Sequence, residues 1–383
     1  MVECKKLIDI ANILYGYPFE SSLFTEDASF MPLIRIRDIK SAKASTFYSG
    51  RIIDDYIITR GDLLVGMDGE FNLGRWNDRD GLLNQRVLKL TGKRDICLNG
   101  YLFHYMSPIF KDIEKTTPGG SVKHLTAKKI NAITISLPSI SEQARIVDIL
   151  DTFTASIENL NQQIAERRKQ FEHYRDTLLD FEGRKEVISW LSFGEDFMLK
   201  ARIGWQGLTK KEYRKKGAYK LITGTDFTTD NKIAFENCVY VDKERYDQDP
   251  YIQIRESDVL ITKDGTLGKI AYIEKLDMPA TLNGGIFVVR DLTERVKQKF
   301  LMYYLTSSVF KDWMKRNHTQ GSIKHLTQTL LSKFTIPVIA ADKQCAIIEK
   351  LDSFTTLISK LEEERDLHQK QYEYYREKLL TFE

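Results

Sequence analysis

A chain of 383 residues is longer than one ordinary hydrophobic core supports, so two or more domains are expected. Its 42% hydrophobic and 29% charged residues are typical of a folded, water-soluble protein, and no apolar run approaches the roughly 18 residues that span a bilayer. Four widely spaced cysteines without a CxxC pair disfavour a disulfide framework or a zinc site. The first residues lack a signal-peptide pattern, and we therefore expect a cytoplasmic protein without a membrane partner.

The formal net charge of +3 conceals an uneven distribution along the chain. Residues 1–139 carry a net charge of +3 and residues 183–339 carry +7, whereas residues 140–182 and 340–383 carry −4 and −3. Two large basic blocks thus alternate with two short acidic ones. This surplus on the large blocks is compatible with a polyanionic partner.

Residues 1–139 form the first predicted globular domain, which we call head 1. Short β-rich runs at 63–67 (LLVGM) and 86–90 (RVLKL) are bounded by Gly and Asp, as strands and hairpins are. Residues 100–113 (GYLFHYMSPIFKDI) are expected to be helical. These elements predict a mixed α+β domain, which closes on the letters GGSVKHLT, residues 119–126.

Residues 140–182 predict one long helix, because the segment contains neither Gly nor Pro. From Leu150 to Phe181 its apolar residues recur in alternating steps of four and three, with Arg167 in one missing place. That alternation is typical of a coiled-coil seam. Some forty residues at about 1.5 Å each give a rod of about 60 Å.

The second half of the chain repeats the first: residues 183–339 form head 2, with strands at 259–262, 270–274 and 286–290 and a helix near 298–314, and residues 340–383 form a second helix. Residues 120–182 align without a gap on 321–383 and match at 25 of 63 positions, including QGSIKHLT, residues 320–327. Such a fixed offset indicates internal duplication. We expect the two helices to pair antiparallel and the whole α+β fold to be pseudo-two-fold symmetric.

No catalytic or metal-binding motif is found in the sequence. The run GTLGK, residues 265–269, lacks the spacing and the Ser/Thr of a phosphate loop, and there is neither a GxSxG motif nor a Pro-Pro pair of an amino-methyltransferase box. The six histidines do not pair at metal-ligand spacing within either head. The sequence therefore favours a binding protein that is not an enzyme and holds no metal or cofactor.

The order of these features resembles the specificity subunit of type I restriction–modification enzymes. The resemblance covers the whole chain and rests on four features: the repeated GSVKHLT and GSIKHLT, the Gln143 and Gln344 that open the helices, RIGWQGLTKKEY…LITGTDF (202–227), and YGYPFESSLF…PLIRIRDIK (15–40). It implies two target recognition domains, each reading one half of a bipartite, asymmetric double-stranded DNA site. The helix pair would set the spacer and dock two methyltransferase subunits, with restriction subunits as further partners. S-adenosylmethionine, ATP and Mg²⁺ would belong to those partners.

Candidate DNA contacts are loop residues that place donors and acceptors on base edges or phosphates. The base-reading candidates are Arg35, Arg37, Asn72, Arg75 and Gln85 in head 1, and Lys210, Lys211, Thr225, Lys263, Thr266 and Lys269 in head 2. Lys123 and Lys324 in the repeated motif are phosphate candidates, while His124 and His325 beside them either touch phosphate or pack the joint. In the shared outline Arg75 matches Lys269 and Asn84 matches Asn283, and the two asparagines fit turns better than base contacts.

Two other functions remain open at this level. A coiled-coil adaptor whose heads bind proteins would show no salt-dependent DNA binding, whereas DNA affinity falls steeply as salt rises. An enzyme with an unrecognised active site would show turnover without partners.

Overall fold

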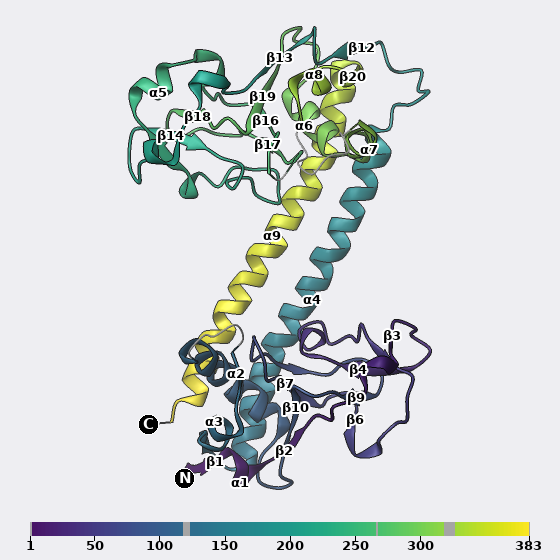
Figure 1. The fold of residues 1–383 in the computed structure, drawn as a ribbon, viewed down its shortest axis with the longest axis vertical. Coiled ribbons are helices and arrows are strands. Elements are labelled where there is room, and N and C mark those ends of the chain that lie inside the picture. The colour runs from purple at the N-terminus through teal and green to yellow at the C-terminus, as the bar shows by residue number, and fades with distance from the viewer. Residues whose placement is uncertain (1, 118–122, 266, 318–325, 383) are drawn as a thin grey trace. The chain divides into compact units, whose positions relative to one another are not determined.

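The computed structural model describes residues 2–117, 123–265, 267–317 and 326–382, and it divides into two compact units (Figure 1). Unit 1 comprises Met1–Gln162 and Glu362–Glu383, and unit 2 comprises Gln163–Leu361. The long helices α4 (Ile140–Leu179) and α9 (Ala341–Leu380) are each continuous across this division. Each unit therefore contains one head and a part of both helices.

In unit 1, a four-stranded antiparallel sheet has the order β2 (Ala11–Tyr15), β10 (Val87–Gly92), β7 (Leu63–Gly66), β8 (Leu73–Arg75). A five-stranded sheet has the order β3 (Phe24–Thr25), β5 (Phe47–Tyr48), β4 (Met31–Ile34), β9 (Gly81–Leu83), β6 (Ile57–Ile58), in which β4 and β9 are parallel. Unit 1 also contains β1 (Glu3–Lys6) paired with β11 (Thr134–Leu137), and the α-helices α1 (Leu7–Ile10), α2 (Asn99–Thr116) and α3 (Ala127–Asn131).

Unit 2 repeats this plan. Its four-stranded sheet has the order β13 (Phe197–Lys200), β19 (Ile286–Asp291), β16 (Val259–Thr262), β17 (Ile270–Tyr272). A second sheet has the order β15 (Val239–Val241), β14 (Tyr219–Ile222), β18 (Ala280–Leu282), in which β14 and β18 are parallel. Unit 2 also contains β12 (Ser189–Ser192) paired with β20 (Thr335–Val338), and the α-helices α5 (Lys243–Asp247), α6 (Gln298–Thr306), α7 (Ser308–Asn317) and α8 (Gln328–Leu331).

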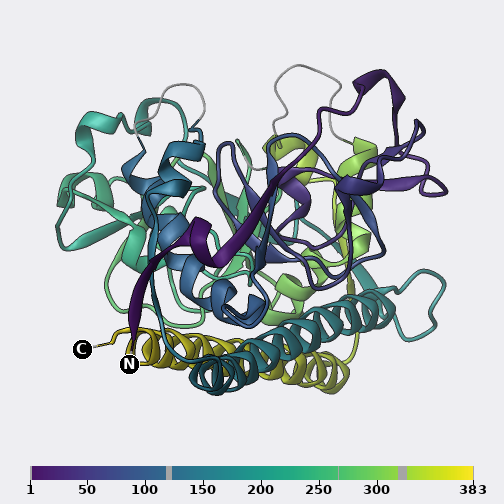
Figure 2. The ribbon, with the colours of Figure 1, turned by 90° about the horizontal axis from the view of Figure 1, so that it is seen from below.

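The predicted α+β fold with a duplicated plan is confirmed. The five β-rich runs named from the sequence are strands β7, β10, β16, β17 and β19, and both predicted head helices are present, the second divided into α6 and α7. In each unit α4 and α9 run antiparallel (Figures 1 and 2). The ring of Phe153 stacks on Tyr375 in unit 1 and that of Phe354 stacks on Tyr174 in unit 2, with centroids 5.3 Å apart in both.

The helix ends complete the cores of the heads. Leu379, Leu380 and Phe382 pack on the core of head 1, and the equivalent residues Leu178, Leu179 and Phe181 pack on the core of head 2. The residues at the C-terminal end of each long helix therefore belong to the hydrophobic core of the unit in which that helix ends. Because both the first and the last residues of the chain belong to unit 1, the two termini lie near each other in both views (Figures 1 and 2). No helix among the described residues combines the length and the apolar character that a bilayer crossing requires.

Candidate nucleic-acid interface

In head 1, the loops that follow β4, β7 and β9 meet at one edge of the domain. The carboxyl ends of parallel strands lie at the same edge of a sheet, which brings together the loop after β4 and the turn after β9. The N–H of Met67 donates to the carbonyl of Arg86 at 2.9 Å, and the N–H of Leu125 donates to the carbonyl of Met67 at 2.7 Å. We call residues 35–38, 67–72, 84–86 and 123–125 loop edge 1.

Head 2 builds the same edge with the same backbone bonds. The N–H of Lys263 donates to the carbonyl of Gly285 at 2.8 Å, and the N–H of Leu326 donates to the carbonyl of Lys263 at 3.1 Å. We call residues 223–226, 263–265, 267–269, 283–285 and 326 loop edge 2. The leucine of the repeated motif thus closes the loop edge in each head, which explains why the motif occurs twice.

The loop after the parallel strand is also held alike in both heads. A buried aspartate, Asp38 or Asp226, accepts the backbone N–H of Arg35 at 2.9 Å or of Thr223 at 2.7 Å. This register makes Arg37 and Thr225 equivalent exposed positions on one rigid turn. The sequence named both as candidates without revealing that they correspond.

Most of the predicted head 1 residues lie together on loop edge 1. Arg35, Arg37 and Gln85 are exposed there, and a guanidinium nitrogen of Arg37 donates to Thr46 Oγ1 at 2.7 Å. Asn72 donates to Glu70 at 2.8 Å, and Lys123 Nζ donates to the carbonyl of Glu114 at the end of α2 at 2.8 Å. Lys123 therefore caps a helix in this structure, and its contact with phosphate stays a prediction.

In head 2, Thr225, Lys263 and Lys269 lie on loop edge 2. Exposed Lys210 and Lys211 sit on a 3₁₀ turn, Lys210–Glu212, directly before Tyr213, whose hydroxyl accepts from Asn283 Nδ2 at 2.5 Å. That hydrogen bond connects the loop that carries Lys210 and Lys211, which we call the basic loop, to loop edge 2. The candidates Thr266 and Lys324, with His325, lie outside the described residues.

The match of Arg75 with Lys269 is wrong. Arg75 pairs with Leu63 across its hairpin, and the residue in that register in head 2 is Tyr272, opposite Val259; Lys269 corresponds to Asn72. Arg75 also lies away from loop edge 1. Its guanidinium contacts Asp151 of α4 at 2.8 Å and covers the ring of Phe103 at 4.4 Å, so it joins the head to the helix.

The match of Asn84 with Asn283 is confirmed. Asn84 follows Leu83, which pairs with Ile34 of the parallel strand, and Asn283 follows Leu282, which pairs with Ile222 in the same way. Asn283 Oδ1 accepts the N–H of Gly285 at 3.2 Å, which is the expected Asx turn. Asn84 is buried, and its carbonyl accepts the N–H of Val87 at 3.2 Å. The turn interpretation therefore holds for both asparagines.

One charged cluster on loop edge 1 was missed by the sequence reasoning. Asp68 contacts His124 Nδ1 at 2.7 Å and Arg86 Nε at 3.3 Å. His124 is thus paired with a carboxylate and exposed, and Arg86 stands beside it. The sequence pattern predicted Arg86 to be the first residue of a strand, but β10 begins at Val87, and Arg86 lies in the turn before it.

In each unit, a buried glutamine at the start of the long helix forms hydrogen bonds with the backbone of the head. Gln143 Oε1 accepts the N–H of Leu98 at 2.9 Å, while Nε2 donates to the carbonyls of Ile96 and Pro138 at 3.0 and 2.9 Å. Gln344 makes the same three bonds in unit 2, to Lys297, Arg295 and Ile339, at 2.8, 2.8 and 3.0 Å. Both side chains are fully buried, which explains the identity of these two residues across the repeat.

The comparisons with known proteins agree with this duplicated arrangement. A family model described as "Type I restriction modification DNA specificity domain" matches residues 1–167 and 206–368. The chain belongs to this family. As a specificity subunit it is similar to the type I restriction enzyme EcoBI specificity subunit of Escherichia coli, with 26% identity over 378 residues, covering 93% of this chain and 79% of the relative.

Two further similarities span the whole length of this specificity subunit. A putative type I restriction enzyme specificity subunit of Haemophilus influenzae is 26% identical over 403 residues, covering 100% of this chain and 96% of the relative. The crystal structure of a type I restriction–modification S subunit from M. genitalium has the same fold, with a TM-score of 0.61 at 16% identity, covering 100% of this chain and 97% of that one.

A second duplicated joint in the specificity subunit centres on Asp151 and Asp352. In unit 1, fully buried His104 contacts Asp151 through Nε2 at 2.7 Å and Tyr372 through Nδ1 at 3.0 Å. In unit 2, Tyr303 takes the place of His104, donates to Asp352 at 2.6 Å, and packs on Phe171, the equivalent of Tyr372. The second ring nitrogen of His104 needs a partner, and the hydroxyl of Tyr372 provides it. Tyr303 has no such second nitrogen, and the equivalent position beside it holds the phenyl ring of Phe171.

Electrostatics keep Asp151 ionised and His104 neutral. Burial raises the pKa of Asp151, but hydrogen bonds from His104 and Arg75 outweigh it and lower that pKa to about 2. Burial lowers the pKa of His104 more than the contact with Asp151 raises it, and Arg75 and Arg376 lower it further. Since an ionised Asp151 only accepts, His104 Nε2–H donates to it and Nδ1 accepts from Tyr372.

This joint predicts acid sensitivity confined to unit 1. Because the pKa of His104 is lower in the folded chain, the unfolded chain binds its proton first, and stability falls as pH drops below about 6.5. Asp151 adds a loss of about 1 kcal/mol as pH falls from 3.8 towards 2, discounted for its partial exposure. The double variant H104Y with Y372F, which copies the unit 2 joint, is expected to flatten the loss that begins near pH 6.5. Hydrogen exchange of unit 1 amides against pH measures this, and an unchanged profile would contradict it.

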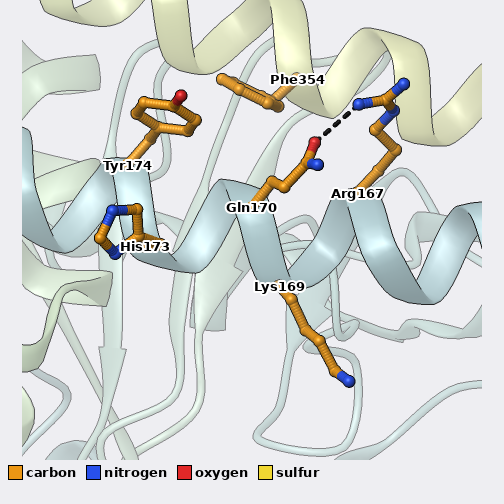
Figure 3. A pocket seen from close by; sticks show the side chains of 6 residues that line it. All are labelled: Arg167, Lys169, Gln170, His173, Tyr174 and Phe354. Carbon is orange, nitrogen blue, oxygen red and sulfur yellow. Dashed lines mark hydrogen bonds between the residues drawn. The ribbon is translucent and has the colours of Figure 1, made fainter.

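A shallow groove runs between α4 and α9 in unit 2, with a volume of about 600 Å³. Arg167, Lys169, Gln170, His173 and Tyr174 from α4 line it together with Phe354 from α9. Tyr174 and Phe354 face each other across it, Arg167 donates to Gln170 at 2.7 Å, and Lys169 points away from α9 (Figure 3). The described residues contain no group of His, Cys, Asp and Glu placed to hold a metal ion.

Proposed function

We propose that this chain is the DNA-reading subunit of a type I restriction–modification system, in which loop edge 1 and loop edge 2 each contact one half of a bipartite, asymmetric site. The observation that carries the proposal is the duplication of one loop frame with different side chains. Arg35 and Arg37 stand in head 1 where head 2 has Thr223 and Thr225. One frame with two sets of side chains is suited to reading two different half-sites.

The helices would set the unread spacer and dock the partners. Support for a spacer role comes from α4, a single helix without Gly or Pro that takes part in both units. Support for two copies of one partner comes from Tyr174 and Tyr375, which are 48% and 40% exposed at equivalent positions. Two equivalent surfaces suit two methyltransferase subunits, and restriction subunits would join that complex.

In this proposal the chain itself is not catalytic. S-adenosylmethionine would bind the methyltransferase subunits, and ATP with Mg²⁺ would bind the restriction subunits, all in the cytoplasm. Support comes from the sequence, in which no methyltransferase or phosphate-loop motif is recognised. The purified chain alone would then bind DNA with a steep salt dependence and without turnover.

The deciding experiment maps methylated adenines in cells that carry this chain with its methyltransferase partner. A motif of two short halves separated by unread bases is expected. The double variant R35T with R37T should change only one half. An uninterrupted palindrome, or loss of both halves together in this variant, would contradict the assignment.

A further inference from the structure

The two loop edges allow a position-by-position comparison of the heads. Met67 and Lys263 are equivalent positions. The backbone N–H of each donates to the turn after β9 or β18, and the backbone carbonyl of each accepts the N–H of the leucine in the repeated motif. The residues that follow are Asp68 with Gly69 and Asp264 with Gly265, and both glycines have φ of +72°. The turn residue facing them is Arg86 in head 1 and Gly285 in head 2.

Arg86 and Gly285 differ in side chain and also in backbone conformation. The φ of Arg86 is +70°, a left-handed conformation that is uncommon and strained for a residue with a side chain. A glycine would adopt it freely, yet the glycine stands in head 2, where φ is not left-handed. The chain keeps an arginine at the strained position.

The side chain of Arg86 is held so that its outer end stays available. Asp68 contacts it through Nε at 3.3 Å, and the side chain remains 59% exposed. Its two terminal nitrogens form no hydrogen bond or ion pair with any of the described residues. Asp68 also contacts His124, so one carboxylate orients two basic side chains on loop edge 1.

Crowding does not account for the difference between the heads. A Cβ atom added at Gly285 would meet Asp264 at 3.7 Å, which is ordinary van der Waals contact. The frame therefore has room for a side chain in both heads. Only head 1 carries one, and that side chain has the parallel donors that match O6 and N7 of guanine.

We propose that Arg86 is a specificity-determining residue of head 1 that reads a guanine in its half-site, and that Asp68 is its positioning residue. This rests on the proposed function, because it assigns one base contact to the edge that reads the first half-site. Head 2, with Gly285, reads the corresponding base pair by another residue or leaves it unread.

The test uses the complex of the full chain with its methyltransferase partner, mapped for methylated adenines and titrated on site variants. R86G copies head 2 and fits the left-handed backbone, so the stability of unit 1, measured by amide hydrogen exchange, should equal or exceed that of the wild type. Discrimination at one guanine of one half-site should fall about 5- to 150-fold, while the other half is unchanged. R86K keeps the charge without the paired donors and should lose the same discrimination. D68N should weaken discrimination at that base and no other.

Arg94 provides the matched control: its side chain is 95% exposed, and it follows β10 at the end of the sheet opposite loop edge 1. R94A should leave the motif unchanged. If R86G discriminates against other bases as well as the wild type does, the proposal is overturned. It is also overturned if R86G lowers the affinity for all DNA sequences alike and makes the dependence of affinity on salt shallower, because that result marks a phosphate contact. Absence of a bipartite motif in the wild type would instead refute the proposed function.

Discussion

Replacing Gln344 by leucine is expected to destabilise unit 2 by about 3 kcal/mol or more while unit 1 keeps its stability. The side chain is fully buried, and a leucine in its place offers no partner to the Lys297 N–H or to the Arg295 and Ile339 carbonyls. Each buried group left without a partner costs about 1–3 kcal/mol. The leucine adds apolar contact, which offsets only a part of three such losses.

The matched variant Q143L should produce the same loss in unit 1, because Gln143 makes the same three bonds there. A single unfolding transition does not describe two compact units, so amide hydrogen exchange read separately in each unit is the appropriate measurement. Equal losses in both units from either variant, or losses below about 1 kcal/mol, would contradict a local joint.

Replacing Arg202 by methionine should lower the stability of unit 2 by about 3–5 kcal/mol and detach the basic loop before Tyr213. Arg202 is 2% exposed, burial lowers its pKa, and all five N–H groups of its guanidinium donate to neutral oxygens. These acceptors are the carbonyls of Leu282, Gln206 and Arg245 and the side chains of Gln248 and Thr281.

A buried charge can often be exchanged for an apolar residue at little loss, provided that its partners are exchanged too. Three acceptors of Arg202 are backbone carbonyls, which no substitution removes. Stability therefore falls, and binding to the half-site of head 2 should fall with it, while head 1 binding persists. Amide hydrogen exchange read in unit 2, together with binding to the two separate half-sites, measures both effects. The variant R202K, with three donors, should lie between wild type and R202M.

Local patterns predicted the helices well, because an apolar step of four and three over forty residues has few alternative structures. The parallel pairs β4–β9 and β14–β18 were not predicted. They join short strands about fifty to sixty residues apart, and nothing in either strand marks its partner. The same pairing creates the loop edges, so the sequence supplied residue types for the site without the frame that assembles them.

The error at Arg75 has a similar cause. Matching the letters LGR (73–75) with LGK (267–269) makes the hairpin between β16 and β17 two residues shorter than the one between β7 and β8, whereas in the structure it is one residue longer, so the match is wrong by three residues. In a strand, a slip by an odd number of residues moves a side chain to the other face. Arg86 was missed because a turn residue next to an apolar run looks like the start of the strand.

The division of the core has a consequence for how the chain is made. Residues 163–361 form a continuous stretch, and everything that unit 2 contains has been synthesised once Leu361 is in place. Head 1 is translated first, but the side chains of Leu379, Leu380 and Phe382 that finish its core are added after all of unit 2. Translation that stops between residues 361 and 379 therefore yields a protein with one finished domain and one with an open apolar core, the kind of product that chaperones and proteases recognise.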